Sequence, residues 1–187
     1  MFIKIYKLNY YIGVMKVKTI RYNKEYQVTD NSIEVARIIK PKWYLSEIEF
    51  YLKNKTILIK KANFWGTYYN IIEMGNSIGK IEWSFKNGYV LSLKNSTDKI
   101  IKYQLKKVST RNWNTSQKQY ILQENDNKVK VILTININYK LTLKWKSYEN
   151  IEIIFSDDSQ IDYLKSVVAL FLMRKQMSLE SSSIYHQ

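Results

Sequence analysis

Apolar and polar residues alternate with a period of two along most of the chain. Ile48, Phe50 and Leu52 alternate with Glu49 and Tyr51. This pattern is typical of β-strands with one buried face. It predicts about twelve strands, near residues 25–29, 33–40, 46–53, 56–61, 67–73, 78–85, 89–94, 99–107, 118–124, 128–135, 139–146 and 150–155. In the strand at 78–85, it places Gly79, Ile81, Trp83 and Phe85 on one face, toward the core.

Short segments rich in Asn and Gly separate these strands. Asn and Gly tolerate positive φ angles, which tight hairpin turns require. Asn87-Gly88 carries the clearest hairpin signal. Further turns are expected at Gly75-Asn76, at Asn54-Lys55 and within residues 125–127 and 136–138. The strands are therefore expected to form an antiparallel meander.

A weak internal repeat accompanies the meander. Residues 69–81 match residues 120–132 at a spacing of 51 positions, and residues 26–30 begin a looser third copy. Two interpretations are open at this point: an internal duplication, or the general likeness of any two hairpins of an antiparallel sheet.

The period changes after the last strand, where the sequence predicts a helix over 161–175, starting near residue 160. Asp157 and Asp158, between two serines, offer caps at its start, while Arg174 and Lys175 complement the helix dipole at its end. Residues 167–173 are all apolar and therefore cover every side of the cylinder. The expected core residues of this helix are Leu164, Val167, Val168, Leu170, Phe171 and Leu172.

A helix that is apolar on all sides must be enclosed on all sides. On one face of an open sheet it would leave about half of its apolar surface in water. We therefore expect a mainly β fold: a closed antiparallel barrel of about 12 strands that encloses the C-terminal helix, in a monomer. The alternative is a dimer in which two such helices bury one another.

The expected organisation is a single domain over 21–176. Residues 1–20 are expected to form a poorly ordered extension, and residues 177–187 a disordered tail. The apolar stretch 161–173 makes a helix of only ~20 Å, short of the ~30 Å hydrocarbon core, so no transmembrane segment is expected. The absence of Cys favours a reducing compartment and a cytoplasmic location.

This order of elements resembles the tubby C-terminal superfamily, whose general plan is shared by LURP-one-related proteins and phospholipid scramblases. The resemblance covers residues 26–175. It rests on Tyr26-x-Val28-x-Asp30, Tyr69-x-Ile71-x-Glu73, Ile48-x-Phe50-x-Leu52, Asn63-Phe64-Trp65, Ile78-Gly79-Lys80-Ile81 and the final helix. These motifs are short, so they point to a fold more than to a function.

The resemblance implies a non-catalytic binding module, since tubby domains bind phosphoinositide headgroups and scramblase-type proteins associate with phospholipid membranes. No headgroup contact can be transferred residue by residue. The resemblance to scramblases also suggests a calcium site, for which the candidate loop is Glu124-Asn125-Asp126-Asn127. This loop offers fewer than the six to eight oxygens that Ca²⁺ prefers, so a turn is expected there and no metal.

The net charge of +14 leaves two interpretations open. A basic field attracts anionic partners such as phospholipid or nucleic acid. However, only four of the 30 basic residues are Arg, the residue preferred for bidentate phosphate recognition. A bias toward Lys, Asn, Ile and Tyr, which AT-rich codons produce, would give the same charge without a function.

The candidate site for an anionic surface is a group of basic residues around a tryptophan. It comprises Lys99, Lys102, Lys106, Lys107, Arg111, Trp113 and Lys118. At a membrane interface, Lys would pair with anionic headgroups and Trp would insert at the boundary. The expected role is peripheral membrane binding. The alternatives are a structural or protein-interaction domain with incidental charge, and a binder of single-stranded nucleic acid that uses some of the 16 Tyr.

Most catalytic chemistry lacks the residues it needs. There is no Cys, and the single His, His186, stands beside the last residue. The segment 75–80 lacks the spacing of a phosphate-binding loop. Glu47 and Glu49, about 7 Å apart on one strand, are the remaining candidates for a hydrolase, although surface ion pairs explain them better. We expect no enzymatic activity and no cofactor.

Overall fold

The computed structural model describes residues 14–21, 25–40, 47–52, 55–63, 67–95, 97–108, 117–125, 129–141, 147–156 and 162–184. Twelve strands precede one helix. The strands are β1 (Val14–Arg21), β2 (Glu25–Asp30), β3 (Ile33–Ile39), β4 (Ile48–Leu52), β5 (Lys55–Lys61), β6 (Tyr68–Glu73), β7 (Asn76–Ser84), β8 (Gly88–Lys94), β9 (Ile100–Val108), β10 (Gln117–Asn125), β11 (Val129–Leu141) and β12 (Ser147–Phe155).

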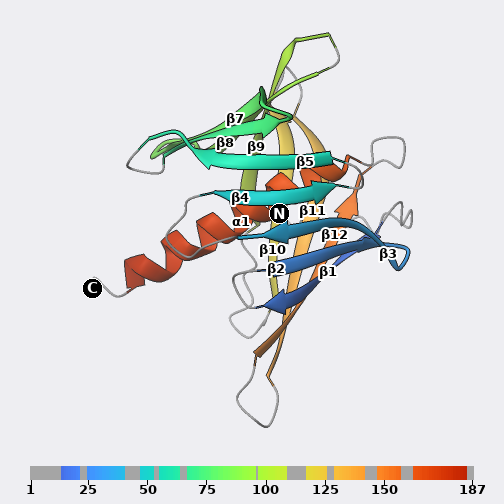
Figure 1. Cartoon of the computed structure of the whole chain (residues 1–187). Coiled ribbons are helices and arrows are strands. Elements are labelled where there is room, and N and C mark those ends of the chain that lie inside the picture. Colours follow the sequence, from blue (N-terminus) through green and yellow to red (C-terminus); the bar gives the residue numbers. More distant parts are fainter. Residues whose placement is uncertain are drawn as a thin grey trace.

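The strands form a closed antiparallel barrel, which confirms the predicted fold class. Each strand pairs with its neighbours in the sequence, and β1 pairs with β12 to close the barrel. The helix α1 (Tyr163–Ile184) contacts β3, β4 and β9. Figure 1 shows α1 running through the ring of strands and emerging on one side, where the C-terminus lies.

The first half of α1 fills the barrel. All seven residues from 167 to 173 are at most 5% exposed, as the apolar run predicts. The predicted core residues Val167, Val168, Leu170, Phe171 and Leu172 are buried, and Leu164 is half-buried against the same core. They pack against inward side chains such as Ile71, Leu91, Ile135 and Ile153, none of which is exposed.

The barrel begins earlier than the sequence analysis expected. Residues 14–20, assigned there to the extension, form β1 and pair with both β2 and β12. Met15 and Val17 point into the core and are 1% and 4% exposed, while Lys16 and Lys18 face outward. The alternation of buried and exposed residues is thus present in β1, but it includes only two core residues and gives a weak sequence signal.

A second difference lies in β11. The turn expected within residues 136–138 is wrong, because β11 is continuous there and pairs with β12 throughout. Ile135 and Ile137 are both fully buried, so the alternation persists through the two Asn residues. The Asn136 side chain accepts a hydrogen bond from Gln119 at 2.9 Å. Merging two expected strands offsets the missed β1, so the total of twelve is unchanged.

The helix differs from the expectation at both ends. Its N-cap is Asp162, whose Oδ1 accepts a hydrogen bond from the backbone N–H of Lys165 at 3.1 Å. The expected caps Asp157 and Asp158 lie outside the described residues. At the other end, α1 continues to Ile184, so residues 177–184 of the expected tail are helical. Glu180 accepts a bond from Lys107 on β9 at 2.7 Å, which holds this part against the barrel.

The hairpins β2–β3, β6–β7 and β10–β11 share one irregularity. In each, the register shifts just after the middle residue of the repeated motif: Val28, Ile71 and Leu122 respectively. The extra residue is Val35, Ile78 or Ile132. A β-bulge at the same place in three hairpins four strands apart favours internal repetition over chance likeness. The bulge also explains why Ile132 and Leu133, adjacent in sequence, are both buried.

The enclosed half of α1 should dominate the stability of the fold. We expect Leu172→Ala to lower the free energy of unfolding by about 3 kcal/mol, because Leu172 is fully buried. Leu179→Ala in the same helix is the matched control, with a change within about 0.5 kcal/mol, since Leu179 is 46% exposed. Urea unfolding of both variants measures the difference. Equal losses would contradict the enclosure of α1.

The barrel should unfold at alkaline pH because several tyrosines are buried. Burial raises the pKa of Tyr89 to about 12 and raises the pKa of Tyr69, Tyr103 and Tyr120. In the unfolded chain these phenols ionise near pH 10. The unfolded state therefore loses protons first, and stability falls as the pH rises above about 10. Phenolate absorbance should rise together with loss of circular dichroism. Ionisation of every Tyr near pH 10 in a folded barrel would contradict the burial.

Candidate functional site

The two ends of the barrel differ because α1 leaves through only one of them. At this helix-exit end, Gln176 and Leu179 of α1 line a cavity of about 370 Å³ together with Trp83, Tyr89 and Lys107. The opposite end carries turns around Ile33, Met74 and Asp98 and the start of α1. Long side chains at the exit end can therefore contact both barrel and helix.

The structure separates the basic residues that the sequence analysis grouped. Lys106 and Lys107 lie at the end of β9, whereas Lys99 precedes its start. Eight residues of strand separate Lys99 from Lys107, about 26 Å. Lys118 lies near the start of β10, at the helix-exit end. Arg111 and Trp113 lie outside the described residues.

These lysines also differ in what they contact. Lys107 is paired with Glu180, and the Lys118 Nζ lies 5.7 Å from the centroid of the Tyr139 ring. Lys102 and Lys106 are exposed, and the structure records no ion pair for either within its described part. Of the predicted group, Lys106 remains exposed near the exit end, while Lys102 lies closer to the start of β9, where it pairs with Ser92.

An aromatic pair lies beside them at the tip of the β7–β8 hairpin, where Trp83 is half-buried against the core and Phe85 is exposed. Phe85 is 95% exposed, and its ring centroid lies 4.6 Å from that of Trp83. The expectation that Phe85 faces the core is wrong, because β7 ends at Ser84 and the alternation stops there. Trp83 lines one groove with Leu179 and Lys106 and another with Lys102. We call Trp83, Phe85, Lys86, Lys102, Lys106 and Leu179 the aromatic edge.

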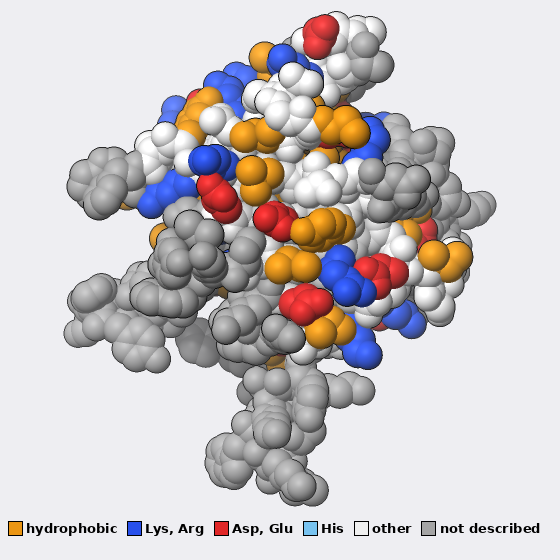
Figure 2. Space-filling model, viewed as in Figure 1, with side chains coloured by type: hydrophobic (Ala, Val, Ile, Leu, Met, Phe, Trp, Pro, Cys, Tyr) orange, Lys and Arg blue, Asp and Glu red, His pale blue; other side chains and the backbone are white. Residues whose placement is uncertain are grey.

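Lysines on another face have acidic partners. Lys55 pairs with Glu73 at 2.8 Å, and Lys60 pairs with Glu47 at 3.1 Å. Figure 2 shows basic and acidic side chains interspersed over the face it presents. The three lysines of the aromatic edge have no such pair among the described residues, and the same holds for Lys94 and Lys99 at the opposite end.

A charged pair fixes α1 where it leaves the barrel. The Arg174 guanidinium donates to both carboxylate oxygens of Glu149 on β12 and lies 5.1 Å from the centroid of the Tyr26 ring. Burial lowers the pKa of Arg174, but the hydrogen bond that it donates to Glu149 and the charges of Tyr26 and Glu149 outweigh it, so the net shift is upward. Arg174 is therefore charged at any physiological pH.

The other candidates from the sequence have ordinary surroundings. Glu47 is paired with Lys60, and Glu49 accepts a hydrogen bond from Tyr51 at 2.6 Å. The segment 75–80 forms a turn and the start of β7, with Gly75 at φ 82°. His186 and the loop residues Asp126 and Asn127 lie outside the described residues. The part of the chain that the structure describes contains no group of three or more side chains able to hold a metal ion.

Comparison with protein family models, curated proteins and solved structures finds no match to this chain. Among the described residues, no helix combines the length and apolar character needed to cross a bilayer.

The sequence did not predict four residues of the aromatic edge: Trp83, which was expected only in the core, Phe85, Lys86 and Leu179. A signal for Phe85 was available: it stands two residues before the Asn87-Gly88 turn, where a residue can lie beyond the last pair of the hairpin. The sequence held no signal for Leu179, because the helix was expected to end at residue 175. Its position depends on the continuation of α1 outside the barrel.

The Arg174–Glu149 pair should couple α1 to β12. We expect Arg174→Met to destabilise the fold by about 2 kcal/mol, since the Glu149 side chain is only 13% exposed and would lose its partner. The double variant with Glu149→Gln should lose less than the sum of the two single losses. Chemical unfolding of the four proteins gives the coupling energy. Strict additivity would show that the pair does not hold α1.

Proposed function

We propose that this chain is a tubby-like, non-catalytic module that binds anionic phospholipid surfaces through its aromatic edge. Phe85 and Trp83 enter the interfacial region of the bilayer, and Lys86, Lys102 and Lys106 contact anionic headgroups. The proposed location is cytoplasmic, peripheral to a membrane.

The exposure of Phe85 beside unpaired lysines is the observation that carries this proposal. A phenylalanine that is 95% exposed gains nothing from the barrel core. Single exposed apolar residues are common, but this one contacts Trp83, which lines a groove together with Leu179. Aromatic rings flanked by lysine stems and charges are the combination favoured at a membrane interface.

The architecture supports surface binding over an internal ligand. Residues 167–173 of α1 occupy the barrel interior, where a carrier protein would hold its ligand. The combination of twelve antiparallel strands and an enclosed C-terminal helix also supports the tubby-like assignment. Shared architecture alone does not give a function, so the aromatic edge is the basis for the choice of phospholipid.

Vesicle flotation tests the aromatic contribution. We expect the wild-type protein to float with vesicles that contain phosphatidylserine and to remain behind with pure phosphatidylcholine. Phe85→Ser should weaken binding about fivefold or more, because one buried ring is lost from the interface. Ile33→Ser is the matched control: Ile33 is 69% exposed at the opposite end, so its replacement should change nothing.

The contribution of the lysines to membrane binding is tested by two matched double variants. We expect the double variant Lys86→Gln, Lys106→Gln to lose about tenfold or more in affinity, at ~1 kcal/mol per lysine. Lys94→Gln, Lys99→Gln removes the same charge at the opposite end and should bind like the wild type. Equal losses in both double variants would show a diffuse charge effect. Equal recovery on neutral and anionic vesicles would contradict membrane binding and favour a protein-interaction domain.

A further inference from the structure

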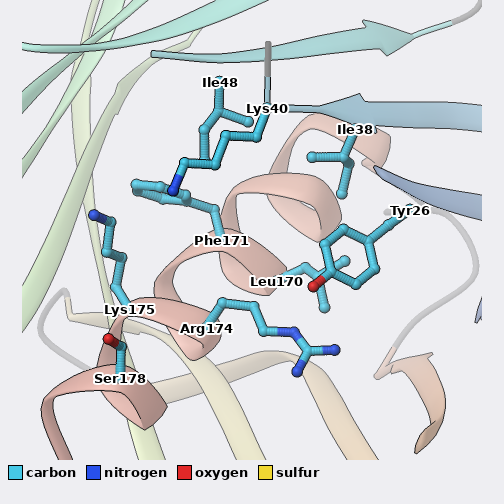
Figure 3. Close-up of a pocket in the computed structure, with 9 residues that line it drawn as sticks. All are labelled: Tyr26, Ile38, Lys40, Ile48, Leu170, Phe171, Arg174, Lys175 and Ser178. Carbon is cyan, nitrogen blue, oxygen red and sulfur yellow. The ribbon is translucent and has the colours of Figure 1, made fainter. Parts of the chain in front are cut away.

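A second cavity lies beside α1 and shares no lining residue with the cavity beside Trp83. It has a volume of about 260 Å³ and lies between α1 and the edges of β2, β3 and β4. Ile38, Ile48, Leu170 and Phe171 give it apolar walls, and Lys40, Arg174 and Lys175 bring positive charge into it. Figure 3 shows these side chains converging from α1 and from the strands. We call this cavity the Lys175 pocket.

Lys175 is placed at an energetic cost. Its Nζ lies 5.3 Å from the centroid of the Tyr69 ring and 5.7 Å from that of Phe171. The structure records no carboxylate or hydrogen-bond acceptor for it within the described residues. Burial lowers the pKa of Lys175, because the charged ammonium is removed from water. Two ring faces compensate this cost only in part.

The neighbouring Arg174 is less available than Lys175 to bind an anion. Its guanidinium already contacts Glu149, so the two charges cancel locally. Its Nε is buried without a hydrogen-bond partner among the described residues. In Figure 3, the guanidinium points toward the Tyr26 side, whereas the ammonium groups of Lys40 and Lys175 lie toward the Phe171 side. The pocket therefore retains the charge of two lysines.

We propose that the Lys175 pocket binds a phosphate monoester that carries a short apolar group. The phosphate lies between Lys40 and Lys175, and the apolar group packs against Ile48 and Leu170. A dianionic phosphate matches two lysines, while a carboxylate neutralises only one. The volume accommodates a headgroup or a short chain but not a complete long-chain lipid, whose pockets are larger.

This site goes beyond the proposed membrane docking and does not require it. Lys175 and Leu179, four residues apart, are neighbours on α1, but this pocket and the cavity beside Trp83 have no lining residue in common. The two sites can therefore be removed separately. The phosphate could belong to a free metabolite or to a lipid headgroup, and the test distinguishes these sources.

The probes are hexyl phosphate, inorganic phosphate, hexanoate and hexanol, titrated into the full-length protein by calorimetry. We expect hexyl phosphate to bind most tightly, since it alone supplies both the dianion and the apolar group. Lys175→Met should weaken its binding about tenfold or more, through loss of one charge-assisted contact. Lys86→Met, at the aromatic edge, is the matched control and should bind hexyl phosphate like the wild type.

Folding of the Lys175→Met variant is checked in the same samples. Because it removes a desolvated ammonium and retains volume, we expect its thermal stability to equal or exceed that of the wild type. Lys40→Met is the second variant and should also weaken hexyl phosphate binding. If hexyl phosphate binds equally to wild type, Lys175→Met and Lys40→Met, the pocket assignment is overturned. Hexanoate binding as tightly as hexyl phosphate would overturn the preference for phosphate.

Vesicles that contain phosphatidic acid provide the second arm. Binding of hexyl phosphate in solution, lost in Lys175→Met, assigns the pocket to a free phosphate monoester. Vesicle binding that depends on Lys175, without binding of hexyl phosphate, assigns it to a lipid headgroup. Failure of both arms overturns the proposal, while phosphatidylserine flotation that still depends on Phe85 leaves the membrane docking standing.

Discussion

The seven successive apolar residues 167–173 have no polar side, and a short helix of this kind is stable only where nothing but protein surrounds it. The barrel satisfies this condition because β1 pairs with β12 and leaves no open edge through which water reaches the helix. The need is mutual. A twelve-stranded barrel has an interior too wide for its own inward side chains to fill, and α1 supplies the missing volume. Closure of the sheet and burial of the helix therefore stabilise one another.

This enclosure also determines where chemistry can occur. Since α1 occupies the interior, charged and aromatic side chains gather where it leaves the barrel. There the seven apolar residues of the helix are followed directly by two cations, Arg174 and Lys175. Arg174 is neutralised by Glu149, whereas the ammonium of Lys175 lies near two aromatic rings and has no carboxylate partner among the described residues. The two proposed sites lie beside the same emerging helix, one facing a membrane and one receiving a small anion.

The fold could be predicted from the sequence because both of its signals are local: alternation in the strands and an uninterrupted apolar run in the helix. The errors arose where local signals were weak or ambiguous. β1 offers only two core residues, and the Asn-rich residues 136–138 resemble a turn although Ile135 and Ile137 continue the strand. The end of α1 was placed at the first cations, but the helix continues to Ile184, and its extension carries Glu180, which bonds to Lys107 across 73 residues of sequence.

The candidate site was harder to predict for the same reason. Lys99 and Lys107 are close in sequence, yet a strand places them at opposite ends of the barrel. Phe85 and Leu179 are far apart in sequence, yet the aromatic edge includes both. Neither relation can be read from composition or spacing, because each depends on the register of β7, β8 and β9 and on the exit of α1.

Native-state hydrogen exchange along α1 tests the enclosure most directly. If the barrel surrounds the helix, the backbone amides of residues 168–173 exchange only through global unfolding, with one common free energy that follows denaturant, while those of residues 178–182 exchange through local opening. Equal and fast exchange along the whole of α1 would show that the helix lies outside a closed sheet, and would contradict the account.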